Sequence, residues 1–300
     1  MKTAYSLIAA CALVALPATA QRDMSAVEVV PTKLNDSTYM LAGAGGNIGL
    51  SIGPDTVFLV DDQYAPLTPG IVAAIARLTD KPVQFVLNTH WHGDHTGGNE
   101  NLGKQGAIIV AHENVRKRMS SEQFTDFTQS TTPPSPPAAL PVVTFSGGTV
   151  TFHVNGDELR AIHMPNAHTD GDTVIHFVKS DVIHMGDIFW NGLYPFIDVS
   201  AGGSVEGTIA ACERALAMIG ERTRVIPGHG PLGTPSELRA YRDMLSTVTA
   251  RIKKMIAAGR GREEIVASGA SAEFDAKWST RFINGERFRA MLAADLMRKP

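Results

Sequence analysis

Continuous apolar runs alternate with amphipathic stretches along the first half of the chain. Residues 56–60 (Thr-Val-Phe-Leu-Val) are such a run, residues 83–87 read as a second strand, and polar residues follow each of them directly. Strands that are buried on both faces of a sheet have this pattern. Between the two segments, apolar side chains recur at helical spacing after Pro69-Gly70: Ile71, Ile75 and Leu78. We therefore predict a strand, a helix and a strand in succession, with a further strand at residues 107–110.

The second half of the chain has the same plan and begins after a proline-rich stretch. Residues 131–141 contain five prolines, which predicts an extended loop rather than a helix or strand. Beyond it, the pattern predicts strands at residues 149–154, 159–163, 173–178, 181–185 and 225–226. One helix should contain Cys212 on its apolar stripe, and a longer helix should begin near Ser236. No sequence repeat is strong enough to prove that the halves are duplicates.

The first twenty residues have the pattern of a secretory signal peptide. Lys2 precedes an apolar stretch at residues 7–16, and the small residues at 18–20 (Ala-Thr-Ala) form a cleavage pattern before Gln21. A lipoprotein signal ending at Cys11 is an alternative, but the apolar stretch continues past that cysteine. A buried N-terminal helix is the other alternative. We expect a periplasmic or secreted protein that begins at Gln21.

The mature chain reads as one domain, residues 21–300, with a helical and polar C-terminal extension from about residue 258. Apolar residues make up 44% of the sequence, which is ample for a core, and 27 basic against 30 acidic side chains give a net charge of −3. This near balance argues against nucleic-acid binding. Outside the N-terminus no apolar run reaches the roughly 18 residues of a membrane span. We therefore expect a small-molecule substrate, with no nucleic acid and no stable membrane span after signal cleavage. The oligomeric state stays open.

A histidine-rich segment after the strand at 83–87 carries the chemistry of the chain. Residues 89–98 read Thr-His-Trp-His-Gly-Asp-His-Thr-Gly-Gly, so that His90, His92, Asp94 and His95 fall within six residues. In an extended backbone His90 and His92 project to the same side, Asp94 shares their parity, and His95 begins a turn. Imidazole and carboxylate ligands suit borderline metal ions, with zinc foremost.

Three more candidate ligands stand in loops that follow predicted strands: His168, Asp187 and His229. Glycines flank His229 in Pro-Gly-His-Gly-Pro, which allows close backbone approach. Ligands in α/β folds gather outside the carboxyl ends of strands. The other histidines read as structural residues of strands or of a surface helix: His112, His153, His163, His176 and His184.

These motifs, in this order, resemble the metallo-β-lactamase superfamily of metallohydrolases. The resemblance runs from about Val27 to about Met255 and includes the glycine-rich turn at residues 45–49 and the strand at 58–61 that ends in Asp61. It implies an α/β fold of the four-layer αββα type, with metals in a groove at one edge of the sheets. It further implies two zinc ions per chain, which the following residues would hold: His90, His92 and His168 the first, Asp94, His95 and His229 the second, with Asp187 bridging both. Asp61 would support one of the imidazoles.

The same resemblance implies an exported dinuclear zinc hydrolase that opens an amide or ester bond with a metal-bound hydroxide. Asp94 would ligate, orient the nucleophile and pass a proton to the leaving group. β-Lactam hydrolysis is the leading candidate activity, because the expected location disfavours a cytosolic thioester substrate.

Two departures keep alternatives open. No cysteine stands among the expected ligands, and the all-histidine-and-aspartate β-lactamase subclass usually lacks a bridging aspartate. Asp187 instead resembles the glyoxalase II and lactonase branches, so a lactonase or thioesterase is one alternative. A non-hydrolytic iron oxidoreductase is another, although related di-iron sites usually have glutamate in place of His92. A metal-binding protein without catalysis is the third.

Overall fold

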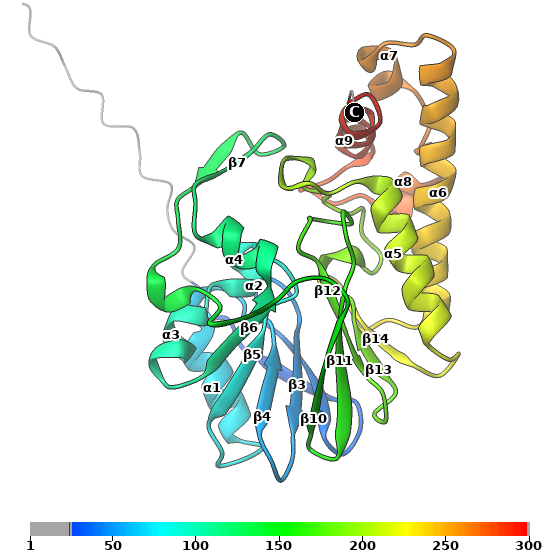
Figure 1. Cartoon of the computed structure of the whole chain (residues 1–300). Coiled ribbons are helices and arrows are strands. Elements are labelled where there is room, and N and C mark those ends of the chain that lie inside the picture. Colours follow the sequence, from blue (N-terminus) through cyan, green and yellow to red (C-terminus); the bar gives the residue numbers. More distant parts are fainter. Residues whose placement is uncertain (1–23, 25, 299–300) are drawn as a thin grey trace, which may run out of the picture.

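Two β-sheets lie face to face with helices on both outer sides (Figure 1). The computed structural model describes residue 24 and residues 26–298, so the predicted signal peptide lies outside the described residues. The first sheet contains, in spatial order, β1 (Val30–Lys33), β2 (Thr38–Ala42), β3 (Ile48–Ile52), β4 (Val57–Val60), β5 (Val83–Leu87), β6 (Ile108–His112) and β9 (Val143–Phe145). The second contains β10 (Thr149–Val154), β11 (Asp157–His163), β12 (Thr173–Phe177), β13 (Val182–His184) and β14 (Arg224–Ile226). A separate hairpin pairs β7 (Gln123–Thr125) with β8 (Ser130–Thr132).

The helices fall into two outer layers. On the side of the first sheet lie α1 (Thr68–Ala76), α2 (Gly93–Thr96), α3 (Asn99–Lys104) and α4 (Glu113–Met119). On the side of the second sheet lie α5 (Val205–Met218) and α6 (Pro235–Ala257), followed by α7 (Arg262–Ala267), α8 (Ala272–Trp278) and α9 (Gly285–Leu296). None of the described helices is both long and apolar enough to cross a membrane.

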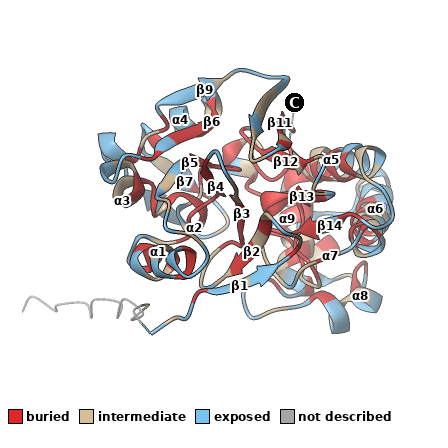
Figure 2. Ribbon diagram, turned by 90° about the horizontal axis from the view of Figure 1, so that it is seen from below, coloured by how far each residue is buried: buried red, intermediate tan, exposed pale blue. Residues whose placement is uncertain are grey.

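Three apolar layers hold the four structural layers together, and β4 shows how the sequence specifies them. Val57 and Leu59 belong to the core beneath α1, while Phe58 and Val60 belong to the core between the sheets. Because successive side chains of a strand point to opposite faces, a strand between two cores must be apolar throughout. A third core joins the second sheet to α5, α6 and α9. The buried residues of Figure 2 follow this arrangement, and the predicted αββα fold class is confirmed.

Several sequence-based expectations need correction. Strands β1 to β3 were not predicted, and the proline-rich stretch includes the end of β8 and a short 3₁₀ helix at Pro137–Ala139. Helix α1 ends at Ala76, so that Leu78 lies beyond it and is 37% exposed. The C-terminal extension is not simply polar, because Trp278, Phe288 and Leu292 are buried in the third core. An extension that supplies core residues is integral to the folded unit.

The topology brings the candidate ligands to one edge of the sandwich. Strands β4 and β5 are parallel, as are β13 and β14. Their carboxyl ends are followed by Asp61, by the His90 segment, by Asp187 and by His229. Strand β12 is antiparallel to β13, so the loop that precedes β12 and carries His168 also lies at this edge. The site is thus assembled from strand ends of both sheets.

Candidate metal centre

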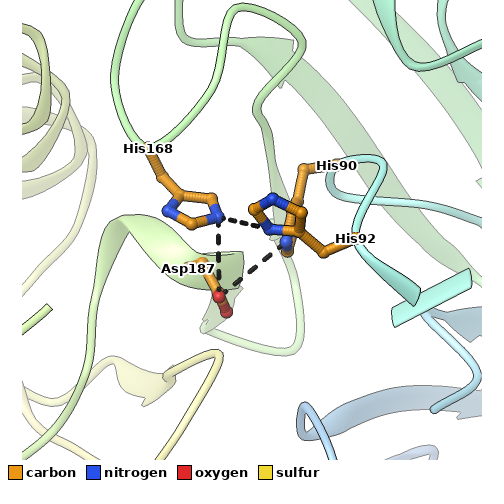
Figure 3. Close-up of side chains that lie close together, drawn as sticks. All are labelled: His90, His92, His168 and Asp187. Atoms are coloured by element: carbon orange, nitrogen blue, oxygen red, sulfur yellow. Dashed lines mark hydrogen bonds and ion pairs between the residues drawn. The ribbon is translucent and has the colours of Figure 1, made fainter. Parts of the chain in front are cut away.

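All seven predicted ligands come together in two groups. One ligand atom from each of His90, His92, His168 and Asp187 lies within 4.8 Å of the others (Figure 3). The second group, Asp94, His95 and His229, meets the same criterion.

Asp187 stands between the two groups and presents one carboxylate oxygen to each. Its Oδ2 lies 3.8 Å from His90 Nε2 and 3.6 Å from His168 Nε2. Its Oδ1 lies 3.0 Å from His95 Nε2 and 3.4 Å from His229 Nε2. A carboxylate in this position can ligate two cations at once, as the sequence analysis expected of a bridge.

The local backbone explains how one short segment supplies both groups. His90 and His92 follow β5 and reach the same group, as their alternate spacing predicted. Helix α2 begins at Gly93 and redirects the chain. Asp94 therefore joins His95 in the second group and not the two histidines with which it shares parity.

The glycines around His229 serve close approach, as predicted. A Cβ atom at Gly228 would overlap Oδ1 of Asp187, and Gly230 adopts a φ of +96°, which side chains other than glycine rarely allow. The Pro-Gly-His-Gly sequence therefore lets the backbone that carries His229 pack directly against the bridging carboxylate.

The three histidines that follow β5, namely His90, His92 and His95, and also His168, each have one ring nitrogen held by a neighbouring group. The contacts join His95 Nδ1 to Asp61 Oδ2 at 2.8 Å, His92 Nε2 to Asp198 Oδ2 at 3.0 Å, His168 Nδ1 to the Phe196 carbonyl at 2.8 Å, and His90 Nδ1 to Thr89 Oγ1 at 3.0 Å. Such contacts set the tautomer and leave the other nitrogen free for a metal. Asp61 thus occupies the supporting position expected from the resemblance.

Sequence reasoning missed Asp198 and Asp172. The Asp172 carboxylate accepts hydrogen bonds from the backbone N–H of His168 at 2.6 Å and of Thr169 at 2.9 Å, which fixes the loop that carries His168. Its position four residues after His168 is a local signal that could have identified it. Asp198 lies 106 residues from His92, and nothing in the sequence separates it from other loop carboxylates.

The electrostatics differ between the two groups. Burial lowers the pKa of His168 to about 4 and that of His90 well below its usual value, so both imidazoles are neutral, as metal ligation requires. Burial opposes the charged form of His229 as well, but the carboxylates of Asp187 and Asp94 raise its pKa to about 9. In the metal-free chain a proton on His229 therefore balances the carboxylates that a metal cation would otherwise balance.

The donor atoms fit a bound cation. Nε2 of His90 and Oδ1 of Asp187 are buried without a hydrogen-bond partner among the described residues. Buried polar atoms are almost always paired, and a divalent ion between them would satisfy both. The donors are imidazole nitrogens and carboxylate oxygens, a set that zinc and other borderline divalent metals accept.

A groove of about 810 Å³ opens over the two groups and has aromatic walls. Trp190 and Phe196 line it together with Tyr64, Trp91 and Phe282. Tyr194 and Asn191 do not: Tyr194 stacks on Phe288 at 4.2 Å, and Asn191 donates to the Pro231 carbonyl. The remaining histidines of the described chain lie outside both ligand groups, as predicted: His112, His153, His163, His176 and His184.

The comparisons with known proteins agree with this geometry. A family model described as the metallo-beta-lactamase superfamily matches residues 43–241, which include every candidate ligand. The chain belongs to this superfamily. Its members are mostly hydrolases. A hydroxyacylglutathione hydrolase of Pelagibacter ubique is 22% identical over 209 residues, covering 68% of this chain and 70% of that protein. A 2,4-dinitroanisole O-demethylase subunit alpha of a Nocardioides species is 28% identical over 151 residues, which are 48% of this chain and 41% of the other.

Solved structures of the superfamily share the fold at low sequence identity. A metallo-beta-lactamase from Pontibacter korlensis and the DIM-1 metallo-beta-lactamase each match with a TM-score of 0.59 and 19% identity. They cover 73% and 74% of this chain and 99% of their own. A double mutant of the sec-alkyl sulfatase PisA1 matches with a TM-score of 0.66 and 17% identity, over 88% of this chain and 49% of its own. Identities this low support the fold and leave the substrate open.

Proposed function

We propose that the protein is a dinuclear zinc hydrolase that opens an amide or ester bond. The observation that carries this proposal is the position of Asp187, whose two carboxylate oxygens face different ligand groups. His90, His92 and His168 would hold one ion, and Asp94, His95 and His229 the other. Two zinc ions bound in this way would polarise a carbonyl and lower the pKa of water towards about 7.

Asp94 is the residue of this chain best placed to handle a proton. Burial opposes its charge, but His95 and His229 lower its pKa to about 2, so it is a carboxylate at neutral pH. Its Oδ2 lies 3.3 Å from His229 Nε2, and its side chain is 21% exposed at the groove. It can accept a proton from attacking water and deliver it to a leaving group in the groove.

We propose β-lactams as the first substrates to test. The superfamily membership and the exported location inferred from the sequence support this choice. A lactone or thioester is the second candidate. The bridging position of Asp187 and the similarity to a hydroxyacylglutathione hydrolase over 68% of the chain favour it.

A substrate panel on zinc-loaded protein tests the proposal. Cephalosporin and carbapenem β-lactams, an acyl lactone, a glutathione thioester and a phosphodiester should be compared at equal concentration. We expect β-lactam turnover that disappears on metal removal and returns with added zinc. Turnover confined to the lactone or thioester would reject the β-lactam assignment and retain the hydrolase. If fully zinc-loaded protein hydrolyses no member of the panel, the proposal that it opens amide or ester bonds would be rejected.

Elemental analysis after gentle purification tests the metal assignment. Seven candidate ligands are too many for one tetrahedral site, so about two equivalents of zinc are expected. Iron retained without zinc would favour the oxidoreductase alternative instead.

We further propose that the chain is exported and cleaved after Ala20. The support is the residue pattern described above, with its short basic start and its Ala-Thr-Ala ending. Intact-mass measurement on periplasmic material should give a protein that begins at Gln21. A mass that retains residues 1–20, or one that includes a lipid on Cys11, would overturn this assignment.

A further inference from the structure

A second cavity of about 350 Å³ lies behind the aromatic wall of the metal groove. It is enclosed by the turn of the β7–β8 hairpin, by residues 197–200 and by helices α7 and α9. Phe127 separates the two spaces, because its ring packs 5.2 Å from Phe196, which in turn contacts His92 at 5.7 Å between ring centroids. In Figure 1 the hairpin and α9 approach each other above the sheets. Of its lining residues, only Asp198 takes part in the site described above, through its contact with His92.

Three guanidinium groups line it, and they differ in how far they are engaged. Arg298 pairs with Asp295 at 2.6 Å and donates to two backbone carbonyls. Arg287 lies over the ring of Phe127 at 4.4 Å and donates to the Phe282 carbonyl. Arg262, the first residue of α7, has no hydrogen-bond acceptor or ion-pair partner among the described residues. Each guanidinium carries five N–H donors, so several remain for a ligand.

The remaining walls combine apolar surface with few opposing charges. Ile197, Met291 and Ala294 form apolar parts of the lining. Two carboxylates reach the cavity, Asp126 and Asp198. Asp198 is already engaged, because it contacts His92 Nε2 and accepts from the Ala201 N–H at 3.0 Å. With Arg298 paired to Asp295 and Asp198 engaged by His92, two arginines, Arg262 and Arg287, face one other lining carboxylate, Asp126.

We propose that this cavity binds an organic carboxylate with a short apolar chain. Arginine forms charge-assisted and often bidentate hydrogen bonds with carboxylates, and the apolar wall removes a hydrocarbon chain from water. A volume of about 350 Å³ lies at the lower end of the range for small-molecule sites. The expected ligand has both a carboxylate and an apolar chain, which excludes a simple inorganic anion and a neutral alcohol.

Calorimetric titration of the full zinc-loaded chain with hexanoate tests the assignment, with hexan-1-ol and inorganic phosphate as probes that each lack one feature. We expect hexanoate to bind at least tenfold more tightly than either. Arg262→Gln should weaken hexanoate about tenfold, since a hydrogen bond to a charged group is lost. Ala294→Phe should abolish binding by filling the cavity. Arg260→Gln is the matched control, because Arg260 is exposed two residues away and pairs with Glu264 outside the cavity.

Three results would overturn the proposal. Binding of hexan-1-ol as tight as that of hexanoate would show that the cavity does not recognise the negative charge. Binding of phosphate as tight as that of hexanoate would show that it does not recognise the hydrocarbon chain. Hexanoate affinity that survives both Arg262→Gln and Ala294→Phe would place the carboxylate elsewhere, for example on the metals. Arg262 is exposed, so Arg262→Gln should fold normally. It therefore tests the proposal even if Ala294→Phe fails to fold. Binding is measured independently of turnover, and its failure is therefore distinct from failure of the hydrolase assignment.

Discussion

The Asp61→Asn substitution should weaken metal binding most at the group of ligands that contains His95. Asp61 is fully buried, and its Oδ2 lies 2.8 Å from His95 Nδ1 while its Oδ1 accepts the backbone N–H of Thr89 at 2.7 Å. An asparagine can keep the bond from the Thr89 backbone N–H but not the one that the Thr89 hydroxyl donates to Oδ2 at 2.7 Å. Its NH₂ group, however, would donate to His95 Nδ1 and favour the tautomer with a proton on Nε2. That is the nitrogen that faces Asp187 and would ligate the metal.

The size of the effect follows from burial of the pair. A hydrogen bond to a charged group contributes about 1.5–3 kcal/mol, and the side chains of both Asp61 and His95 are 0% exposed. Since about 1.4 kcal/mol corresponds to a factor of ten in an equilibrium constant, we expect a loss of about 10- to 100-fold in affinity. Replacement of residues that orient metal ligands typically has an effect of this size.

Competition between the protein and a chromophoric chelator for zinc gives both affinities, and circular dichroism checks the fold. Asp62→Asn is the matched control. Asp62 is also buried, but its Oδ1 accepts only the Gly98 N–H at 2.8 Å, and burial raises its pKa well above the usual value. Among the described residues its side chain has no hydrogen bond to any of the seven candidate ligands, so zinc affinity should not change. Wild-type affinity at both sites in Asp61→Asn, or equal losses in the two variants, would refute the reasoning.

Three further predictions concern protons, reactivity and stability. The carboxylates of Asp187 and Asp94 overcome the effect of burial and raise the pKa of His229 to about 9, so a metal must displace its proton at pH 7 and affinity should rise with pH up to about 9. Calorimetry in two buffers of different ionisation enthalpy should detect proton release at pH 7, and its absence would contradict this. Burial raises the pKa of the Cys212 thiol far above its usual value, so a thiol reagent should label it only on unfolding, and rapid labelling of native protein would count against the packing described here. Phe58 is fully buried between the sheets and packs edge-on against Phe152 at 5.0 Å, so Phe58→Ala should lower the free energy of unfolding by about 3–5 kcal/mol in denaturant titration. Val142, 70% exposed, is the control and should change it by less than about 0.5 kcal/mol on replacement by alanine.

Strand β4 was predictable from sequence, whereas β1 was not. The run that became β4 is apolar because both faces of the first sheet are covered at this strand. Strand β1 reads Val-Pro-Thr-Lys and is exposed or half-buried throughout, so no periodicity marked it. Its position follows from pairing with β2, which is a tertiary contact that local patterns do not encode.

The ligands were predictable for a different reason. His90, His92, Asp94 and His95 are concentrated in one segment, and metal chemistry makes such a concentration informative. Their division between two groups came from the family resemblance, because parity alone would have placed Asp94 with His90. Asp198 could not be found in this way, since its role depends on a contact with His92 across 106 residues.

Zinc titration of Asp187→Ala beside His176→Ala tests the central claim most directly. His176 is a half-buried strand residue outside both ligand groups, so its variant should bind two equivalents of zinc like the wild-type chain. Asp187 presents one oxygen to each group, and a carboxylate shared by two dications would offset part of their repulsion. We predict that Asp187→Ala loses affinity at both sites and releases the second ion readily to chelators. Two tightly held zinc ions in Asp187→Ala would contradict the bridged centre and leave Asp187 an ordinary carboxylate at the end of a strand.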